Sequence, residues 1–509
     1  MTFQDILDGA EVLSQSGTAR ITGVEYDSRQ VRPGSLFVAM RGGSSDGNRF
    51  IDAAIAAGAA AIITDSLDET PRKNVAWAVV PHGRRALARI SANFYKRPAE
   101  RLALTGITGT NGKSTTAFLV ESILNAAQRK CALVGTIEYH VCRKTLPAPH
   151  TTPESLELNR IFAQAVGCGS TEAVLEVSSH ALDQQRVFAM PFDVAVFTNL
   201  TRDHLDYHAT FDDYFAAKRV LFEGCGTEPP RVAVTNLDDA YGAQLVQFSK
   251  RKGSRVLTYG ISSGDFRSQE VQISTSGTHF RMLTPAGSVP ISSPLLGHVN
   301  VSNILAAAAA AYSRDCTLEV ISMGVSALLR VPGRFQPVDA GQPFSVIVDY
   351  AHTDDALRNL TALARQFVTQ NGGQGRVITL FGCGGDRDRA KRPLMAAAAA
   401  KESDFVVLTS DNPRREDPQA IIRDALPGFQ GLSTRYTVEA DRRAAIRLAV
   451  HDARPGDIVL IAGKGHEKVQ ILPTGPVPFD DVQVASEALQ QLGYNSQQNP
   501  MAVLGAPRE

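Results

Sequence analysis

The sequence is poor in the features that mark membrane, exported and nucleic-acid-coating proteins. It has no uninterrupted run of about 18 apolar residues, the length that a membrane-spanning helix requires. Its start, MTFQDILDGAEVLSQ, has no basic segment followed by an apolar one, so no export signal is indicated. Neither sign of charge is in excess: 52 basic residues stand against 52 acidic ones, which argues against wholesale neutralisation of a phosphate backbone. We therefore expect a cytoplasmic protein with neither a membrane nor a nucleic acid as partner.

Cysteine is scarce and shows no recognisable spacing. The six cysteines form no CxxC pair and no zinc-binding pattern. In a chain of 509 residues this scatter is typical of reduced thiols in a cytoplasm rather than of disulfides or a metal site. We therefore predict free thiols at Cys131, Cys142, Cys168, Cys225, Cys316 and Cys383.

What the sequence does contain predicts an α/β protein of several domains. Its hydrophobic fraction of 43% is ordinary for a folded chain, and ~100–200 residues per domain suggest about three domains. Apolar runs such as SLFVAM, AVLEVSS and DVAVFTNL alternate with helix-compatible segments, as in mostly parallel sheets with helical crossovers. The polar stop YKRP and the breakers at Pro332 and Gly333 divide the chain. The predicted domains are 1–98, 99–332 and 333–509, with a mostly parallel central sheet and a Rossmann-like C-terminal domain.

The strongest local motif is GITGTNGKST, from Gly106 to Thr115, between an apolar strand and an amphipathic helix. Small residues let successive backbone N–H groups face one anion, Lys113 adds a positive charge, and the Ser114 hydroxyl can reach Mg²⁺. The usual first glycine of a phosphate loop is replaced by Ile107, so the motif is a variant. The pattern predicts a nucleotide triphosphate site; a plain Gly-rich turn is the alternative.

Three further segments carry polar groups that admit two interpretations each. Glu176 ends an apolar strand, where a carboxylate could bind Mg²⁺ or the following SSH could simply cap a helix. The loop TRDHLDYH, with His204, could bind a metal or be an ordinary polar loop. Lys218 lies in the amphipathic segment YFAAKRVLF, where a solvated face is the common explanation.

Taken together, the segments GTNGKST, EVSSHAL, NLTRDHLDYH and YFAAKRVLF resemble the Mur ligases, the ATP-dependent enzymes that add amino acids to the peptidoglycan precursor. Further matches are DSR from Asp27, GHVNVSN from Gly297, GRF from Gly333, DYAH from Asp349, GCGGDRDRAKRP from Gly382, DNPR from Asp411 and GKGHE from Gly463. The likeness spans most of the chain. It implies three domains that bind, in order, a uridine nucleotide-sugar, ATP and an amino acid.

The resemblance implies an ATP site with Mg²⁺ at its centre. Mg²⁺ would be held by Ser114, Glu176, His204 and Lys218, the lysine being carbamylated by CO₂ into an anionic oxygen ligand. Lys113, Glu176, His204 and Lys218 are the expected catalytic residues. The expected ATP-binding residues are Gly109, Thr110, Asn111, Gly112, Lys113, Ser114, Thr115, Asn303, Arg334, Asp349 and His352.

The resemblance also implies a site for the nucleotide-sugar peptide. Its expected residues are Ser28, Ser44, Ser45, Thr151, Thr152, Ser178, Gln184 and Arg186. The family pattern has Asn before the paired threonines, whereas this chain has His150, whose role is open. Without the resemblance, Ser28 would read as an ordinary polar turn.

The remaining predicted site concerns the amino acid that is added. Meso-diaminopimelate carries a distal carboxylate beside an ammonium, and a planar guanidinium such as Arg414 binds a carboxylate through two parallel hydrogen bonds. By resemblance, relatives that add diaminopimelate have Arg here, and those that add lysine usually do not; a surface arginine at a helix start is the alternative. The expected residues are Arg387, Asp411, Asn412, Pro413, Arg414, Gly463 and Glu467.

The implied reaction joins meso-diaminopimelate to the D-Glu of UDP-MurNAc-L-Ala-D-Glu through an acyl phosphate, with release of ADP and phosphate. Phosphorylation gives a carboxylate a good leaving group, and positioning and charge stabilisation supply most of the catalysis. Two alternatives stay open: a ligase that adds L-lysine at the same step, and a phosphate-loop ATPase or phosphotransferase without amide synthesis. A monomer acting on small molecules is expected.

Overall fold

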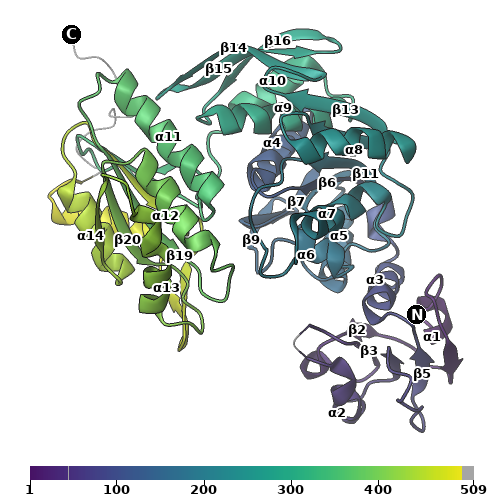
Figure 1. Ribbon diagram of the computed structural model, residues 1–509. Helices are drawn as coiled ribbons and strands as arrows, with labels where there is room; N and C mark the ends of the chain where they lie inside the picture. Colours follow the sequence, from purple (N-terminus) through teal and green to yellow (C-terminus); the bar gives the residue numbers. More distant parts are fainter. Residues whose placement is uncertain (44, 496–509) are drawn as a thin grey trace.

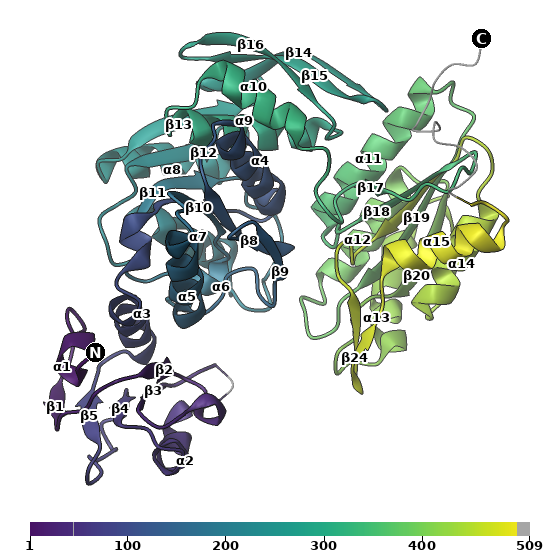
Figure 2. The ribbon, with the colours of Figure 1, turned by 180° about the vertical axis from the view of Figure 1, so that it is seen from behind.

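Three separate β-sheets follow one another along the chain in the computed structural model, which describes residues 1–43 and 45–495 (Figure 1). The first sheet lies at one end of the molecule, the second in the middle and the third at the other end (Figures 1 and 2). The predicted Ser44 lies outside the described residues. All three sheets have parallel cores, which confirms the predicted α/β class with three domains.

The first sheet has five strands in the order β1-β5-β4-β3-β2, and all but β1 run parallel to their neighbours. The strands β3 and β4 are buried along their whole length, so they read in the sequence as continuous apolar runs. The elements are α1 (Phe3–Ile6), β1 (Ser14–Ser16), β2 (Gly23–Glu25), η1 (Ser28–Gln30), β3 (Ser35–Ala39), η2 (Gly47–Phe50), α2 (Ile51–Ala56), β4 (Ala61–Thr64), β5 (Ala76–Val79), α3 (Gly83–Phe94) and η3 (Pro98–Arg101).

The second sheet has eleven strands in the order β16-β15-β14-β13-β12-β11-β6-β10-β7-β8-β9. Its centre, from β13 to β7, is parallel, whereas β14–β16 and β7–β9 pair antiparallel at the two edges. The strands are β6 (Ala103–Thr108), β7 (Cys131–Val134), β8 (Glu138–Val141), β9 (Lys144–Pro147), β10 (Glu172–Glu176), β11 (Phe192–Phe197), β12 (Val232–Asn236), β13 (Arg255–Gly260), β14 (Phe266–Ser274), β15 (Gly277–Thr284) and β16 (Gly287–Ser293). The helices are α4 (Lys113–Ala126), α5 (Ser155–Gly167), α6 (Ser179–Asp183), α7 (Phe211–Glu223), α8 (Ala240–Arg251), α9 (His298–Tyr312) and α10 (Leu318–Ala327).

The third sheet has six strands in the order β17-β18-β22-β19-β20-β21, parallel except at β17. The strands are β17 (Gln336–Pro337), β18 (Ser345–Asp349), β19 (Val377–Cys383), β20 (Phe405–Ser410), β21 (Arg435–Val438) and β22 (Ile458–Ala462), with a separate hairpin of β23 (Val469–Leu472) and β24 (Gly475–Pro478). The helices are α11 (Asp354–Gln370), α12 (Lys391–Lys401), α13 (Pro418–Ala425), η4 (Leu426–Phe429), α14 (Arg442–Asp452) and α15 (Asp481–Gln491).

The antiparallel arm β14–β16 reaches from the second sheet toward the third (Figures 1 and 2). Its residue Ile273 is buried in the core that surrounds α11, and its carbonyl accepts a hydrogen bond from Gln370 Nε2 at 3.2 Å. The arm therefore joins the central and C-terminal domains at a distance from the phosphate loop.

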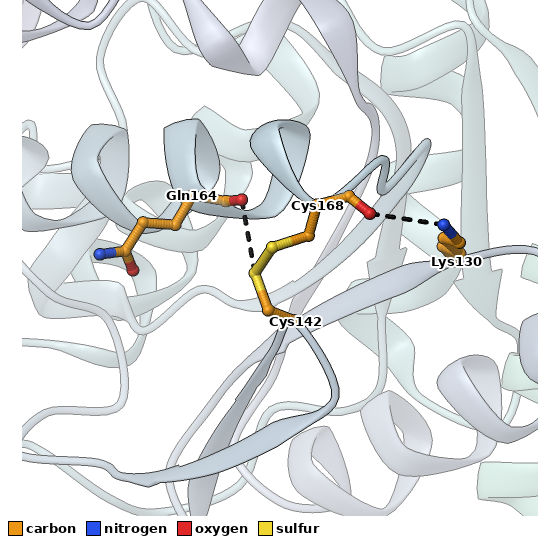
Figure 3. The surroundings of a disulfide bond; sticks show 4 residues. All are labelled: Lys130, Cys142, Gln164 and Cys168. Atoms are coloured by element: carbon orange, nitrogen blue, oxygen red, sulfur yellow. Dashed lines mark hydrogen bonds between the residues drawn. A yellow bond between two sulfur atoms is a disulfide. The ribbon is translucent and has the colours of Figure 1, made fainter.

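The prediction of six free thiols is wrong for two of them. Cys142, in the turn between β8 and β9, forms a disulfide with Cys168, which follows α5 (Figure 3). Cα atoms 26 residues apart in sequence lie 5.6 Å apart, a separation typical of disulfides. Sequence spacing did not reveal the pair because the fold of the hairpin against α5 brings the two cysteines together. The free cysteines are Cys131, Cys225, Cys316 and Cys383.

No helix within residues 1–43 and 45–495 is long and apolar enough to cross a membrane.

Candidate active site

The phosphate loop lies between β6 and the start of α4, as its sequence predicts. Gly109 and Gly112 have positive φ angles of 148° and 85°. A Cβ at Gly109 would lie 1.8 Å from Thr198 Oγ1, and one at Gly112 would lie 2.4 Å from Asn303 Oδ1. Only glycine fits either position. The departure at Ile107 also has a reason, because this residue is a fully buried part of β6 and the loop begins two residues later.

Glu176 ends β10 beside this loop and is fully buried. Its Oε2 accepts a hydrogen bond from Ser114 Oγ at 3.0 Å and lies 2.9 Å from Thr136 Oγ1, while Oε1 accepts the backbone N–H of Thr136 at 2.8 Å. Parallel pairing aligns Glu176 with Ile107, which places the carboxylate at the loop's edge of the sheet. The hydroxyl and the carboxylate expected to share a cation are thus in direct contact.

Lys218 lies in α7, which begins after its N-cap Thr210, and its side chain is not a solvated one. Only 2% of its surface is exposed. Its Nζ donates to Gly109 O at 2.9 Å and lies 4.4 Å from the centre of the Tyr214 ring. The interpretation of this lysine as a solvent-facing residue is therefore wrong.

Lys113 shares one of these acceptors. Its Nζ donates to Gly109 O at 3.0 Å and to Thr110 O at 2.8 Å. Burial lowers the pKa of Lys113, and Glu176 acts in the opposite direction. Burial, reinforced by the charge of Lys113, holds the pKa of Lys218 well below its usual range.

His204 follows β11 in a polar loop and has a positive φ of 55°. Burial lowers its pKa to about 3, with Asp203 opposing this and His180, Lys218 and Lys113 adding to it. The imidazole is therefore neutral at neutral pH, which is the form that binds a metal ion. Ser114 and Glu176 are thus in direct contact, the two lysines share the carbonyl of Gly109, and the charges of both lysines act on His204.

These donors fit a hard divalent cation. A serine hydroxyl and a carboxylate are the oxygen ligands that Mg²⁺ or a similar ion prefers, and a neutral imidazole has a free nitrogen lone pair that can complete the set. Lys218 as a free amine lacks the oxygen that a hard ion prefers. In the part of the chain that the structure describes, no three His, Cys, Asp or Glu side chains are grouped to hold a metal. The expected site accordingly depends on Ser114 and Lys218 as well.

The far side of the loop is formed by residues from both the central and the C-terminal domain. Arg334 Nη2 donates to Ser114 Oγ at 3.4 Å, and its guanidinium lies 4.7 Å from the Tyr350 ring centre. Asp349 ends β18 and accepts the backbone N–H of Phe335 at 2.6 Å and that of Ala351 at 2.8 Å. Arg334 is thereby placed over the phosphate loop from across the domain boundary.

A pocket opens between the two domains beside this loop. Eight of the eleven predicted ATP-binding residues line it: Asn111, Gly112, Ser114, Thr115, Asn303, Arg334, Asp349 and His352. The pocket is closed on one side by apolar side chains of the α9 region and α11, among them Leu296, Val299, Leu360 and Leu363. Gly109, Thr110 and Lys113 belong to the same loop segment but are not among the residues that line the pocket.

Sequence reasoning missed several residues of this pocket. Asn199 Oδ1 accepts the backbone N–H of Asn111 at 2.9 Å, and Asp355 Oδ2 accepts from Asn111 Nδ2 at 3.0 Å. Asn236 and Tyr259, at or near strand ends, also line it. Asn199 stands directly after a strand-like run, a position that could have flagged it.

Asp203 was also missed as a contact between domains. Its side chain is 8% exposed and lies 3.3 Å from Lys391 Nζ and 3.7 Å from His352 Nε2, both from the C-terminal domain. It also lies 3.4 Å from His204 Nε2. Burial raises the pKa of the Asp203 carboxyl, but Lys391 and the two histidines outweigh it and hold the pKa well below its usual range.

The predicted nucleotide-sugar peptide residues of the central domain adjoin Glu176. Thr152 Oγ1 donates to Glu176 O at 2.8 Å and accepts the Ser178 backbone N–H at 3.1 Å. Arg186 donates to Thr152 O at 2.9 Å and to Gln184 Oε1 at 2.8 Å.

Other members of this set make fewer contacts with the core of the site. Thr151 Oγ1 lies 3.1 Å from Thr136 Oγ1. Ser178 caps α6 by accepting the Ala181 N–H at 3.2 Å, as its capping interpretation predicts. The His150 side chain is exposed, and its carbonyl accepts a hydrogen bond from Tyr139 at 2.6 Å. Ser28 begins η1 and Ser45 is exposed, both in the N-terminal domain and apart from this group.

The predicted amino-acid residues gather at the ends of β19, β20 and β22. Arg414 has a φ of 54° and donates to Gly385 O at 2.8 Å. A Cβ at Gly384 would lie 3.1 Å from Arg414 Nη1 and 3.6 Å from Arg387 Cγ, so the two arginines flank this glycine. Burial lowers the pKa of Arg414, and the nearby Arg387 adds to this.

The acidic members of the set lie beside the arginines. Asn412 Nδ2 donates to Glu467 Oε2 at 2.9 Å, and both Asp411 and Glu467 interact with the charge of Arg414. Asn412 and Pro413 are buried, as is Gly463, whose N–H donates to Asp349 O at 3.0 Å. A guanidinium pair next to a carboxylate can bind a molecule that carries both a carboxylate and an ammonium.

Comparison with known proteins agrees with this arrangement. Residues 107–311 match the Mur ligase middle domain, residues 333–465 the Mur ligase, glutamate ligase domain, and residues 20–95 the catalytic domain of the Mur ligase family. A UDP-N-acetylmuramoyl-L-alanyl-D-glutamate--2,6-diaminopimelate ligase of Solibacter usitatus (strain Ellin6076) is 52% identical over 479 residues, which cover 94% of this chain and 95% of that protein.

Two further relatives bear the same name. The ligase of Geobacter metallireducens (strain ATCC 53774 / DSM 7210 / GS-15) is 44% identical over 94% of this chain and 96% of its own. A solved structure of such a ligase is 35% identical, covers 97% of this chain and 100% of its own, and superposes with a TM-score of 0.67. From these matches and from the site that its three domains build, the chain belongs to the Mur ligase family.

Proposed function

We propose that this protein is the ATP-dependent, ADP-forming ligase that joins meso-diaminopimelate to the D-Glu of UDP-MurNAc-L-Ala-D-Glu in peptidoglycan synthesis. The observation that carries the proposal is that relatives named for this reaction are 52% and 44% identical to it over nearly its whole length. The paired arginines beside Glu467 agree with an acceptor that bears both a carboxylate and an ammonium.

The proposed chemistry begins with attack of the D-Glu carboxylate on the γ-phosphorus of ATP. An acyl phosphate and ADP form, and the amine of the acceptor then displaces phosphate. Lys113 and Arg334 would be the cations that face the phosphates, a role supported by their contacts with Gly109 O and Ser114 Oγ in and beside the loop. Mg²⁺, held by Ser114, Glu176, His204 and Lys218, would offset the growing charge.

We propose that Lys218 serves as a carbamate. The buried amine has one carbonyl acceptor and an aromatic face beside it, and none of the ion pairs between described residues includes it. Reaction of the neutral amine with CO₂ forms an N–C bond and releases one proton. The product is an oxygen anion suited to Mg²⁺, in place of a cation that would repel it.

We propose that the chain divides at residues 98 and 332, and that the nucleotide-sugar peptide spans the first two of these domains. Ser28, Ser44 and Ser45 would bind the uridine end of the nucleotide, and the Thr151 and Arg186 groups its peptide end. All three substrates would meet on a single chain, so we propose a monomer that works in the cytoplasm on small molecules. The proposed ATP contacts, Gly109 to Thr115 with Asn303, Arg334, Asp349 and His352, lie between the other two sites.

The proposal is tested by an acceptor comparison with the purified chain. Phosphate release is measured with ATP, Mg²⁺ and UDP-MurNAc-L-Ala-D-Glu, with either meso-diaminopimelate or L-lysine added. Release should require both the nucleotide-peptide and meso-diaminopimelate. Faster turnover with L-lysine would favour the lysine-adding alternative, and release without any acceptor would favour an ATPase.

The role of Arg414 is tested in the same assay. Arg414→Ala should raise the KM for meso-diaminopimelate about 10- to 100-fold, because hydrogen bonds to a charged group are worth ~1.5–3 kcal/mol. The neighbouring Arg415, 87% exposed and paired with Asp386, is the matched control, and Arg415→Ala should change little. An equal rise in the KM for ATP would show that Arg414 does not select the acceptor.

A further inference from the structure

One lysine with a fully buried side chain, Lys464, contacts the proposed diaminopimelate residues. Lys464 comes two residues after β22. Its Nζ donates to Glu467 Oε2 at 2.8 Å and to Asn412 Oδ1 at 3.0 Å, and lies 3.8 Å from Asp411 Oδ1. Burial of an ammonium costs several kcal/mol unless it is paired and hydrogen-bonded. Glu467 therefore pairs with the ammonium at hydrogen-bond distance, Asn412 adds a neutral acceptor, and Asp411 is a second carboxylate nearby.

This group fixes the orientation of Glu467. Its Oε2 accepts from both Lys464 and Asn412 Nδ2, and Asn412 is itself fixed because its Oδ1 accepts the Ile471 N–H at 3.0 Å. No donor among the described residues bonds Oε1 of Glu467. The Glu467 side chain is 28% exposed, so Oε2 is held by two hydrogen bonds while Oε1 is left for a ligand.

We propose that Lys464 is a positioning residue for acceptor selection: it holds Glu467 and Asn412 so that the accessible Glu467 oxygen receives the distal ammonium of the diamino acid. The inference rests on the proposed function, since it deepens the account of the same site. Arg414 and Arg387, on either side of Gly384, would receive the distal carboxylate. The site would thus recognise an ammonium and a carboxylate that lie at a fixed distance from each other. Lys464 would fix the position of Glu467, the group that binds the ammonium.

The experiment replaces Lys464 by Met, which has similar length and no charge. Lys464→Met should raise the KM for meso-diaminopimelate at least about tenfold and leave the KM for ATP and for the nucleotide-peptide within about twofold. Lys464→Arg, which keeps the charge, should give a smaller rise confined to the same substrate. The control is Lys468→Met, because Lys468 is on the same segment but is 64% exposed and bonds Asp480.

A double variant separates positioning from a general structural role. Because Lys464 acts through Glu467, the effects of Lys464→Met and Glu467→Gln on the KM for the diamino acid should not multiply. Multiplying effects, an unchanged KM for the acceptor, or an equal rise in the KM for ATP would overturn the proposal. If Lys464→Met does not fold, as judged by circular dichroism, Lys464→Arg is used instead. It should raise the KM for the diamino acid but not that for ATP, and its effect should not multiply with that of Glu467→Gln.

The wild-type protein in the same series tests the proposed function separately. If it uses L-lysine rather than meso-diaminopimelate, the proposed acceptor is wrong. The Lys464 variants are then scored with L-lysine, which also carries a distal ammonium, and the same selective rise in its KM is expected.

Discussion

At the scale of single residues, burial decides what the ionisable side chains of the site can do. Lys218 and Lys113 share the carbonyl of Gly109 as a hydrogen-bond acceptor. Two ammonium groups at such a position would repel each other, and burial would strengthen the repulsion by removing water, which agrees with the lowered pKa of Lys218. Conversion of one of them into an anionic carbamate would relieve it.

Lys218→Ala should lower kcat by at least about 100-fold, because it removes a proposed ligand of the metal. A short carboxylic acid added to the assay should restore part of the activity by supplying the missing oxygen anion. The measurement is kcat with and without the acid, and the control is Lys250→Ala, an exposed lysine of α8. Turnover equal to that of the wild type would rule out the carbamate.

A half-buried ion group lies in β8 and α4, outside the proposed active site. His140 of β8 lies between Glu121 of α4, 2.7 Å from its Nδ1, and Glu138, 2.9 Å from its Nε2. Burial opposes protonation of the ring, but the two carboxylates outweigh it and raise the pKa of His140 to about 9 from its usual 6.5.

This shift predicts how the stability of the protein depends on pH. A raised pKa means that the folded state holds a proton that the unfolded state has lost, so the stabilisation is complete below pH 6.5 and is lost as pH rises through 9. His140→Gln should therefore cost about 2 kcal/mol of unfolding free energy at pH 6 and much less at pH 10. Urea unfolding of the wild type and of His140→Gln at pH 6 and pH 10 measures this difference in unfolding free energy. A difference that grows with pH would contradict the raised pKa of His140.

At the scale of elements, the β8–β9 hairpin is attached to the central domain at two points near the C-terminal end of β8. His140 holds one side to α4, and Cys142 joins the turn to the end of α5 (Figure 3). The chain leaving β9 leads directly into the segment with Thr151 and Thr152, which contacts Glu176. The hairpin therefore supports a segment of the proposed substrate site.

Cys142→Ser should lower the free energy of unfolding by about 3 kcal/mol, because a closed loop of 26 residues restricts the unfolded chain. The measurement is chemical unfolding without reductant, compared with Cys131→Ser, which removes a free thiol. Thiol titration of the wild-type protein, unfolded without reductant, should find four free thiols. A count of six thiols in the wild type, together with equal unfolding free energies for Cys142→Ser and Cys131→Ser, would contradict the disulfide.

At the scale of the whole molecule, the proposed active site lies where a few polar contacts join the central and C-terminal domains. Lys391 and His352 meet Asp203, Arg334 meets Ser114, and Arg202 pairs with Asp388 at 3.1 Å. Ion pairs of this kind across an interface fix one relative orientation because any shift leaves buried charges unpaired.

We expect the Asp203–Lys391 pair to stabilise the arrangement in which the two domains meet at ATP. Asp203→Asn and Lys391→Met should each lower kcat/KM, and the double variant should be no worse than the more damaging single one, a coupling of about 1–3 kcal/mol. Steady-state kinetics give the coupling, and small-angle scattering should show a more extended particle for each variant. Additive effects would show that the pair does not act as a unit.

Much of the fold and the site could be predicted from the sequence, because local patterns determine local structure. Alternating apolar runs predicted the parallel sheets, and the glycines at 109 and 112 predicted the phosphate loop that they alone can form. Glu176 at a strand end followed from the same pattern.

Other features depend on which distant segments the fold brings into contact. The burial of Lys218, the disulfide of Cys142, the contacts of Asp203 across domains and the contact of Lys464 with Asn412 all depend on residues from different elements. Hydrophobic periodicity and turn chemistry act within about ten residues, so the sequence by itself determined the elements and their motifs. Pairing, burial and charge balance act between segments, and these were decided only when the tertiary structure removed the side chains from water and set them side by side.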